Sequence, residues 1–141
     1  MERRDFLKSC AAVCGAGVVL SLALQSCKTV YVATTTLENN QLKVKKSEFT
    51  EENNPVRAFV VLRSDQLDFP VVVYKTNDVY TALSTKCTHS GCEVQPNKVS
   101  LVCPCHGSEF SSTGKVLNPP AERDLKQYIV TTDTDYFYVQ L

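Results

Sequence analysis

Alternating apolar and polar positions predict short β-strands along most of the chain after residue 41. The runs are rich in β-branched and aromatic residues, and they occur around 41–46, 57–63, 70–75 and 79–84. Asn77 and Asp78 interrupt the last two runs and predict a hairpin turn between them. These strands are spaced about ten residues apart, as in compact β domains.

Two more hairpins are expected nearer the C-terminus. The stretch "EVQPNKVSLV" predicts a turn at Pro96 and Asn97, and "KQYIVTTDTDYFYVQL" predicts one near Asp133 to Asp135. No window after residue 41 has the apolar spacing of a helix. The fold class is therefore all-β and antiparallel.

The first 26 residues follow a different pattern, that of an export signal or membrane anchor. A charged start with Arg3 and Arg4 precedes an uncharged run from Ser9 to Ser26. The start resembles the R-R-x-F-L-K pattern of bacterial twin-arginine (Tat) signals, although an ordinary secretory signal remains open. "LALQSC" resembles a lipobox, which implies a lipoprotein with lipidation at Cys27.

Two other fates of this segment remain open, because Gln25 is unusual in a lipobox. The uncharged run is just long enough to span a membrane as an uncleaved anchor, and simple cleavage is the third possibility. All three place the body outside the cytoplasm, on the periplasmic side, and the first two tether it to a bacterial membrane. We expect a signal or anchor over 1–26, a tether and first strand over 27–45, with the body starting near Gln41, and the folded domain over 46–141.

Composition and charge narrow the function classes. The chain has 141 residues, enough for one domain with an appended segment, and 43% of them are hydrophobic. The formal net charge is zero, and acidic and basic residues are interspersed. Nucleic-acid binding is excluded because the chain lacks the basic footprint that it needs.

The chemistry concentrates in "STKCTHSGCEVQPNKVSLVCPCHGSEF", residues 84 to 110. This stretch holds both histidines and four of the seven cysteines. Cys87 with His89, and Cys103 with His106, offer one thiolate and one imidazole in each of two loops. Two sulfurs and two nitrogens suit either zinc or an iron–sulfur cluster.

Two features favour the cluster over zinc. Cys92 and Cys105 are left over, one in each loop, and could staple the loops together in an exported protein. Small and turn-forming residues adjoin the candidate ligands, as needed where backbone N–H groups must point at bridging sulfides. These residues are Gly91, Pro104, Gly107 and Ser108.

The motifs "CTHSGC" and "CPCHGS" resemble the two boxes of the Rieske iron–sulfur family, C-T-H-x-G-C and C-P-C-H-G-S. The resemblance covers roughly 55–141, including "TGKVLNPPAERDLKQY". It implies a Rieske-type antiparallel β-sandwich whose two loops bind one [2Fe–2S] cluster per chain. Cys87 and Cys103 would hold one iron, and His89 and His106 the other. Cys92 and Cys105 would form a disulfide, as in the cytochrome bc and bf members.

The resemblance also implies the function. Neutral imidazoles make such a cluster less negative than four thiolates would, so its potential is high, and it carries one electron. Ser108 would donate a hydrogen bond to the cluster, whereas Phe110 stands where many high-potential relatives have Tyr.

The sequence leaves three functions open. They are a lipid-anchored electron carrier, the Rieske subunit of a quinol:cytochrome c oxidoreductase, and the small subunit of a periplasmic molybdenum oxidase. The partners would be a quinol and cytochrome b complex, a c-type cytochrome or a molybdenum enzyme. The short segment between the boxes and the weak anchor favour the carrier, which would not be catalytic alone.

Overall fold

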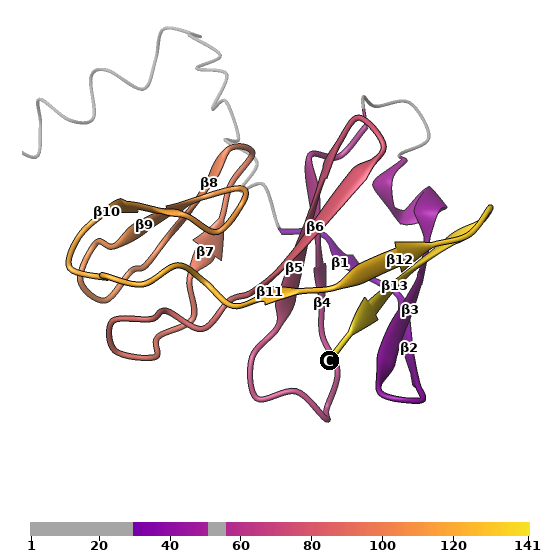
Figure 1. Cartoon of the computed structure of the whole chain (residues 1–141), viewed down its shortest axis with the longest axis horizontal. Coiled ribbons are helices and arrows are strands. Elements are labelled where there is room, and N and C mark those ends of the chain that lie inside the picture. The colour runs from indigo at the N-terminus through magenta and orange to yellow at the C-terminus, as the bar shows by residue number, and fades with distance from the viewer. Residues whose placement is uncertain (1–29, 51–55) are drawn as a thin grey trace, which may run out of the picture.

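Three small β-sheets form the part of the chain that the computed structural model describes, residues 30–50 and 56–141 (Figure 1). Their strand orders are β1-β4-β5-β6-β11, β12-β13-β3-β2 and β10-β9-β8-β7. All pairs are antiparallel except β1 with β4, which is parallel. The elements are β1 (Val32–Ala33), β2 (Thr35–Glu38), β3 (Gln41–Lys45), the 3₁₀ helix η1 (Lys46–Phe49), β4 (Phe59–Leu62), β5 (Val71–Thr76), β6 (Val79–Ser84), β7 (Gln95–Pro96), β8 (Ser100–Val102), β9 (Glu109–Ser111), β10 (Val116–Asn118), β11 (Gln127–Tyr128), β12 (Val130–Thr132) and β13 (Tyr136–Gln140).

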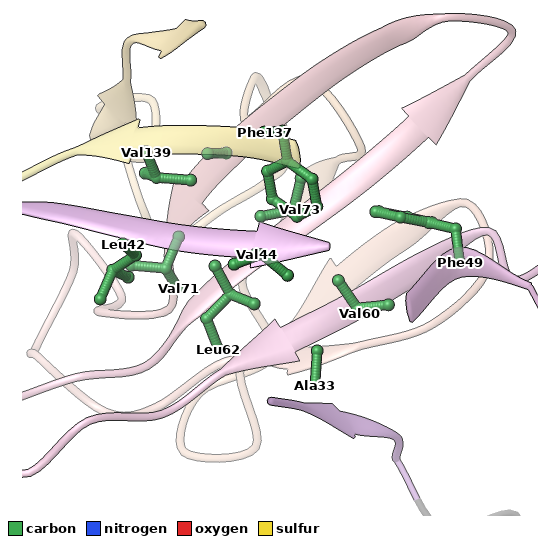
Figure 2. Close-up of a cluster of buried hydrophobic side chains, with 11 residues drawn as sticks. Ala33, Leu42, Val44, Phe49, Val60, Leu62, Val71, Val73, Phe137 and Val139 are labelled. Carbon is green, nitrogen blue, oxygen red and sulfur yellow. The ribbon is translucent and has the colours of Figure 1, made fainter. Parts of the chain in front are cut away.

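The first two sheets pack on each other around one core (Figure 2). Leu42 and Val44 alternate inward along β3, and Phe137 and Val139 do so along β13. They meet three valines and one leucine of β4 and β5, all fully buried, which are Val60, Leu62, Val71 and Val73. The two-residue period of a strand puts these side chains on one face, so the alternation seen in the sequence becomes this core.

The third sheet, β10-β9-β8-β7, lies to one side of the other two (Figure 1). It belongs to residues 85–126, which form an excursion between β6 and β11, although these two strands pair directly as Leu83 with Gln127 and Ala82 with Tyr128. A second core joins it to the central sheet and contains Val72, Leu83, Leu101 and Phe110. The excursion is thus packed onto the strands from which it leaves.

The predicted all-β class is confirmed, and so are the four predicted strands and the three hairpins. One turn is shifted, because Pro96 belongs to β7 and the turn spans 97–99, where the Asn97 side chain accepts hydrogen bonds from the N–H groups of Val99 and Ser100. The expected tether contains two short strands, β1 and β2, and the three-residue β9 and β10 were not predicted.

The predicted export signal, the paired arginines and Cys27 lie outside the described residues. Among residues 30–50 and 56–141, no helix has the length and apolarity needed to cross a membrane.

Candidate metal centre

Two loops of the excursion fold into the same turn. In the first, the Cys87 N–H donates to the Cys92 carbonyl at 2.8 Å and the Gly91 N–H donates to the Cys87 carbonyl at 2.9 Å. In the second, the Cys103 N–H donates to the Ser108 carbonyl at 2.8 Å and the Gly107 N–H donates to the Cys103 carbonyl at 3.0 Å. Each loop therefore presents its first cysteine from an equivalent position.

Gly91 and Gly107 make this turn possible. Both have φ of +77°, the left-handed region in which side chains are strained. A Cβ at Gly107 would have no heavy atom within 4 Å, and one at Gly91 would meet Lys86 Cε only at 3.6 Å. The glycines are thus required by backbone conformation and not by lack of space.

The first cysteines of the two loops offer buried thiols. Cys87 and Cys103 are free of disulfides and only 2% and 1% exposed. Burial is the largest single influence on the pKa of Cys87 and opposes its ionisation. Hydrogen bonds from the backbone of His89 and the side chain of Cys103, with smaller ones from Ser90 and Ser108, outweigh it and lower that pKa. The site therefore stabilises the thiolate, the form that binds a metal.

The two histidines lie beside each other at the surface. The ring centroids of His89 and His106 are 4.9 Å apart with their planes perpendicular, and both residues are exposed. The Ser90 hydroxyl lies 3.3 Å from His106 Nδ1 and links the two loops. Ser90 was not among the predicted site residues, and its small polar side chain gave no signal in the sequence.

A disulfide joins Cys92 and Cys105, the pair that the resemblance implied. It closes the two loops on each other across a sequence separation of 13. The Sγ atoms of Cys92, Cys103 and Cys105 all lie within 4.8 Å of one another. Because Cys92 and Cys105 are bonded to each other, Cys103 is the one of these three that can bind a metal, and its thiol lies directly beside the disulfide.

A third segment, around residues 121–123, supports the first two. The buried Ser108 hydroxyl accepts a hydrogen bond from the Ala121 N–H at 3.0 Å, and the Thr88 hydroxyl donates to the Arg123 carbonyl at 2.6 Å. Pro104 is exposed, whereas Phe110 is fully buried in the same core as Cys87 and Cys103. The family resemblance included residues 121–123, but the sequence did not predict that they contact the two loops.

The structure thus brings the four predicted ligands to two neighbouring loops, thiols inside and imidazoles outside. This donor set of two thiolates and two imidazoles fits an iron–sulfur cluster with mixed ligands.

Comparison with known proteins agrees with this geometry. The family profile described as Rieske [2Fe-2S] domain matches residues 38–129. A cytochrome b6-f complex iron-sulfur subunit of Chlorobaculum thiosulfatiphilum is 30% identical over 138 residues, which are 95% of this chain and 72% of the relative. The subunit of the same name from Chlorobaculum tepidum is 34% identical over 76 residues, 52% of this chain and 42% of that protein, so the match covers less than half of that relative.

Solved structures are also similar. The plasma membrane Rieske protein PetC3 of the cyanobacterium Synechocystis PCC 6803 is 35% identical, with a TM-score of 0.53 over 60% of this chain and 87% of that one. A chain from the oxygenase–ferredoxin complex of carbazole 1,9a-dioxygenase shares the fold, with a TM-score of 0.55 at 21% identity over 73% of this chain and 94% of that one.

Proposed function

The chain belongs to the Rieske [2Fe-2S] domain family, and on this premise we propose that it is a one-electron carrier tethered outside the cytoplasm of a bacterial cell by a lipid on Cys27. It is an electron-transfer protein with a [2Fe–2S] cluster. The observation that carries the assignment is the pair of identical turns, each with a buried free thiol, clamped by the Cys92–Cys105 disulfide.

The proposed ligands are Cys87 and Cys103 for one iron, and His89 and His106 for the other. The buried thiols and the exposed imidazoles support this division, because it places the neutral ligands at the surface. The cluster supplies reversible one-electron chemistry at a potential raised by those neutral ligands. Because the imidazole rings are exposed, a redox partner could come close to the cluster through them.

The N-terminal segment would be an export signal over 1–26 that delivers the folded protein. After cleavage, Cys27 would begin a short tether ahead of β1. The lipobox resemblance supports lipidation, and the intact mass of the mature protein tests it. An unmodified or uncleaved N-terminus would contradict this part of the proposal alone.

A second function is favoured by the names of the relatives. Both Chlorobaculum proteins are subunits of a cytochrome b6-f complex. The alternative is therefore a Rieske subunit of a quinol-oxidising complex, in which the exposed imidazoles would hydrogen-bond a quinol. Purification from membranes in mild detergent separates the two, because a co-purifying cytochrome b supports the complex.

The assignment of the cluster ligands is tested by variants. We expect two irons and two sulfides per chain and a Rieske-type EPR signal after reduction. Cys87→Ser and His106→Ala should lose the signal, whereas Lys98→Gln, at an exposed position on the β7–β8 turn, should keep it. Stoichiometric zinc without acid-labile sulfide, in protein from the native host, would contradict the proposal.

A further inference from the structure

A groove of about 450 Å³ lies directly beside the proposed cluster ligand Cys87. One wall is the loop that follows β6, with Lys86, Thr88 and Gly91, and the other is the segment Arg123 to Lys126 that leads into β11. The loop leaves from β6 and the segment leads into β11, and these two strands are paired neighbours (Figure 1). We call this feature the basic groove.

Hydrogen bonds hold the two walls of the basic groove at a fixed separation. The Thr88 hydroxyl donates to the Arg123 carbonyl at 2.6 Å, and the Ser84 N–H donates to the Lys126 carbonyl at 2.9 Å. The groove is therefore present before any ligand arrives, so that binding does not require the walls to be ordered first.

Positive charge dominates the basic groove although the chain as a whole is neutral. Lys86, Arg123 and Lys126 are exposed, and within the described residues none of them forms an ion pair. Lys86 lies over the Phe69 ring and Lys126 over the Tyr128 ring, contacts that position their chains and leave the charges uncompensated.

Two of the nearby carboxylates already form ion pairs of their own, whereas Glu122, which precedes Arg123 in the chain, is exposed. Asp124, also in the lining, binds Lys115 at 2.7 Å and accepts the Val116 N–H at 3.0 Å. Glu93, on the strand side of the cluster loop, pairs with Arg63 at 2.8 Å. Three cations therefore face solvent next to the site of electron transfer, and none of them has an ion-pair partner in the part of the chain that the structure describes.

We propose that the basic groove receives acidic side chains on the surface of the protein that takes an electron from this one. The inference rests on the proposed electron-carrier function. Exposed cations on open walls give weak, salt-sensitive pairs, which suit a partner that must bind and leave quickly. They would also steer the partner so that its contact surface lies against the cluster ligand.

Occupation of the groove would also favour electron release. A carboxylate beside Cys87 opposes the extra negative charge of the reduced state. The reduced protein then loses one electron and the acceptor gains it, with no further reactant. Acidic groups in the groove should thus bind the oxidised form more tightly and lower the midpoint potential.

The test uses holoprotein whose EPR signal has first been verified, so that a missing cluster would count against the proposed function and not against the groove. A hexaglutamate peptide serves as the acidic surface, with hexalysine as the opposite charge and citrate as a small polyanion. Arg123→Gln with Lys126→Gln removes two groove charges. Lys45→Gln with Lys98→Gln removes two exposed charges that do not line the groove.

We expect hexaglutamate to bind at low salt, to lower the potential, and to lose up to about fivefold in affinity for each groove charge removed. The Lys45 and Lys98 control should bind nearly as the parent does, and added salt should weaken every complex. Equal weakening in the two double variants would overturn the proposal. So would tighter binding of citrate than of the peptide, which would indicate a small-anion site.

Discussion

Ser108 connects the three segments of the metal centre through a single buried hydroxyl. Its oxygen accepts the Ala121 N–H, and its side chain helps to lower the pKa of the Cys87 thiol. A donor aimed at a ligand sulfur stabilises the more negative, reduced state and so raises the potential. Phe110 lies in the same core but has no donor.

We therefore expect Ser108→Ala to lower the midpoint potential. One hydrogen bond is worth about 0.5–1.5 kcal/mol, which corresponds to roughly 20–65 mV for one electron. Voltammetry at fixed pH measures the shift, and Ser112→Ala, on the turn between β9 and β10, is the control. An unchanged potential would show that the hydroxyl does not act on the sulfur.

Phe110→Tyr should act in the opposite direction. A hydroxyl added to this buried ring, which lies in the same core as both thiols, would supply a new donor and raise the potential by an amount of the same order. The same voltammetry applies. A Tyr variant at or below the parent's potential would show that the hydroxyl cannot reach a ligand sulfur.

At the scale of elements, the sheet β10-β9-β8-β7 is attached to the five-stranded sheet β1-β4-β5-β6-β11 through a few specific contacts. The Tyr74 hydroxyl on β5 lies 2.9 Å from the carbonyl oxygens of both Asn97, on the turn between β7 and β8, and Ser100, the first residue of β8. Burial raises the pKa of Tyr74 above its usual value, so it remains a donor at any ordinary pH. Gly114, between β9 and β10, packs against Leu83 of β6.

Tyr74→Phe should loosen the β7–β8 hairpin, because it removes the hydroxyl that donates to these carbonyls and leaves Ser100 with only the Asn97 N–H as donor. We expect a loss of about 0.5–1.5 kcal/mol in the free energy of unfolding, with faster amide exchange in this hairpin than elsewhere. The control is Tyr138→Phe, on β13 of a different sheet. It removes an exposed hydroxyl that donates to Asp133, and it should leave the β7–β8 hairpin unaffected. Equal exchange in both variants would contradict this attachment.

Gly114→Ala should destabilise the protein by more than about 1 kcal/mol for two reasons. Gly114 has φ of +82°, and an added Cβ would lie 2.8 Å from Leu83 Cδ2. Urea unfolding measures the change. Combining it with Leu83→Ala should cost less than the sum of the two single changes, because the second removes the clash; strict additivity would rule the clash out.

At the scale of the whole molecule, the sequence predicted the core strands and their hairpins better than the short strands and the contacts between distant segments. The alternation of Leu42, Val44, Phe137 and Val139 is a local pattern, and it directly predicts core strands. β2 is Thr-rich with no fully buried position, so its sequence lacks a clear apolar alternation, and β1, β9 and β10 have only two or three residues, too few for a period. The two ligand motifs could be recognised in the sequence. The hydrogen bond from Thr88 to Arg123 could not be predicted from a local pattern, because it joins residues 35 apart.

The Cys92–Cys105 disulfide joins the two loops that carry the proposed cluster ligands. A loop of this size is worth roughly 3 kcal/mol in chain entropy. We expect Cys92→Ser with Cys105→Ser to lose the cluster in air much faster, followed by its visible absorbance. Arg63→Gln breaks only the exposed pair with Glu93 beside Cys92 and should change the cluster lifetime little. A lifetime unchanged by loss of the disulfide would show that the clamp does not protect the cluster.

The excursion of residues 85–126 leaves from β6 and returns on β11, and these strands are hydrogen-bonded neighbours. Its two ends are therefore fixed close together by the sheet beneath, whatever lies between them. Such a segment can be exchanged as a unit where the replacement keeps the residues that pack against Val72 and Leu83, because the ends are already held by the paired strands. We expect the corresponding segment of a relative, grafted between Ser84 and Gln127, to bring its own redox properties to the same base.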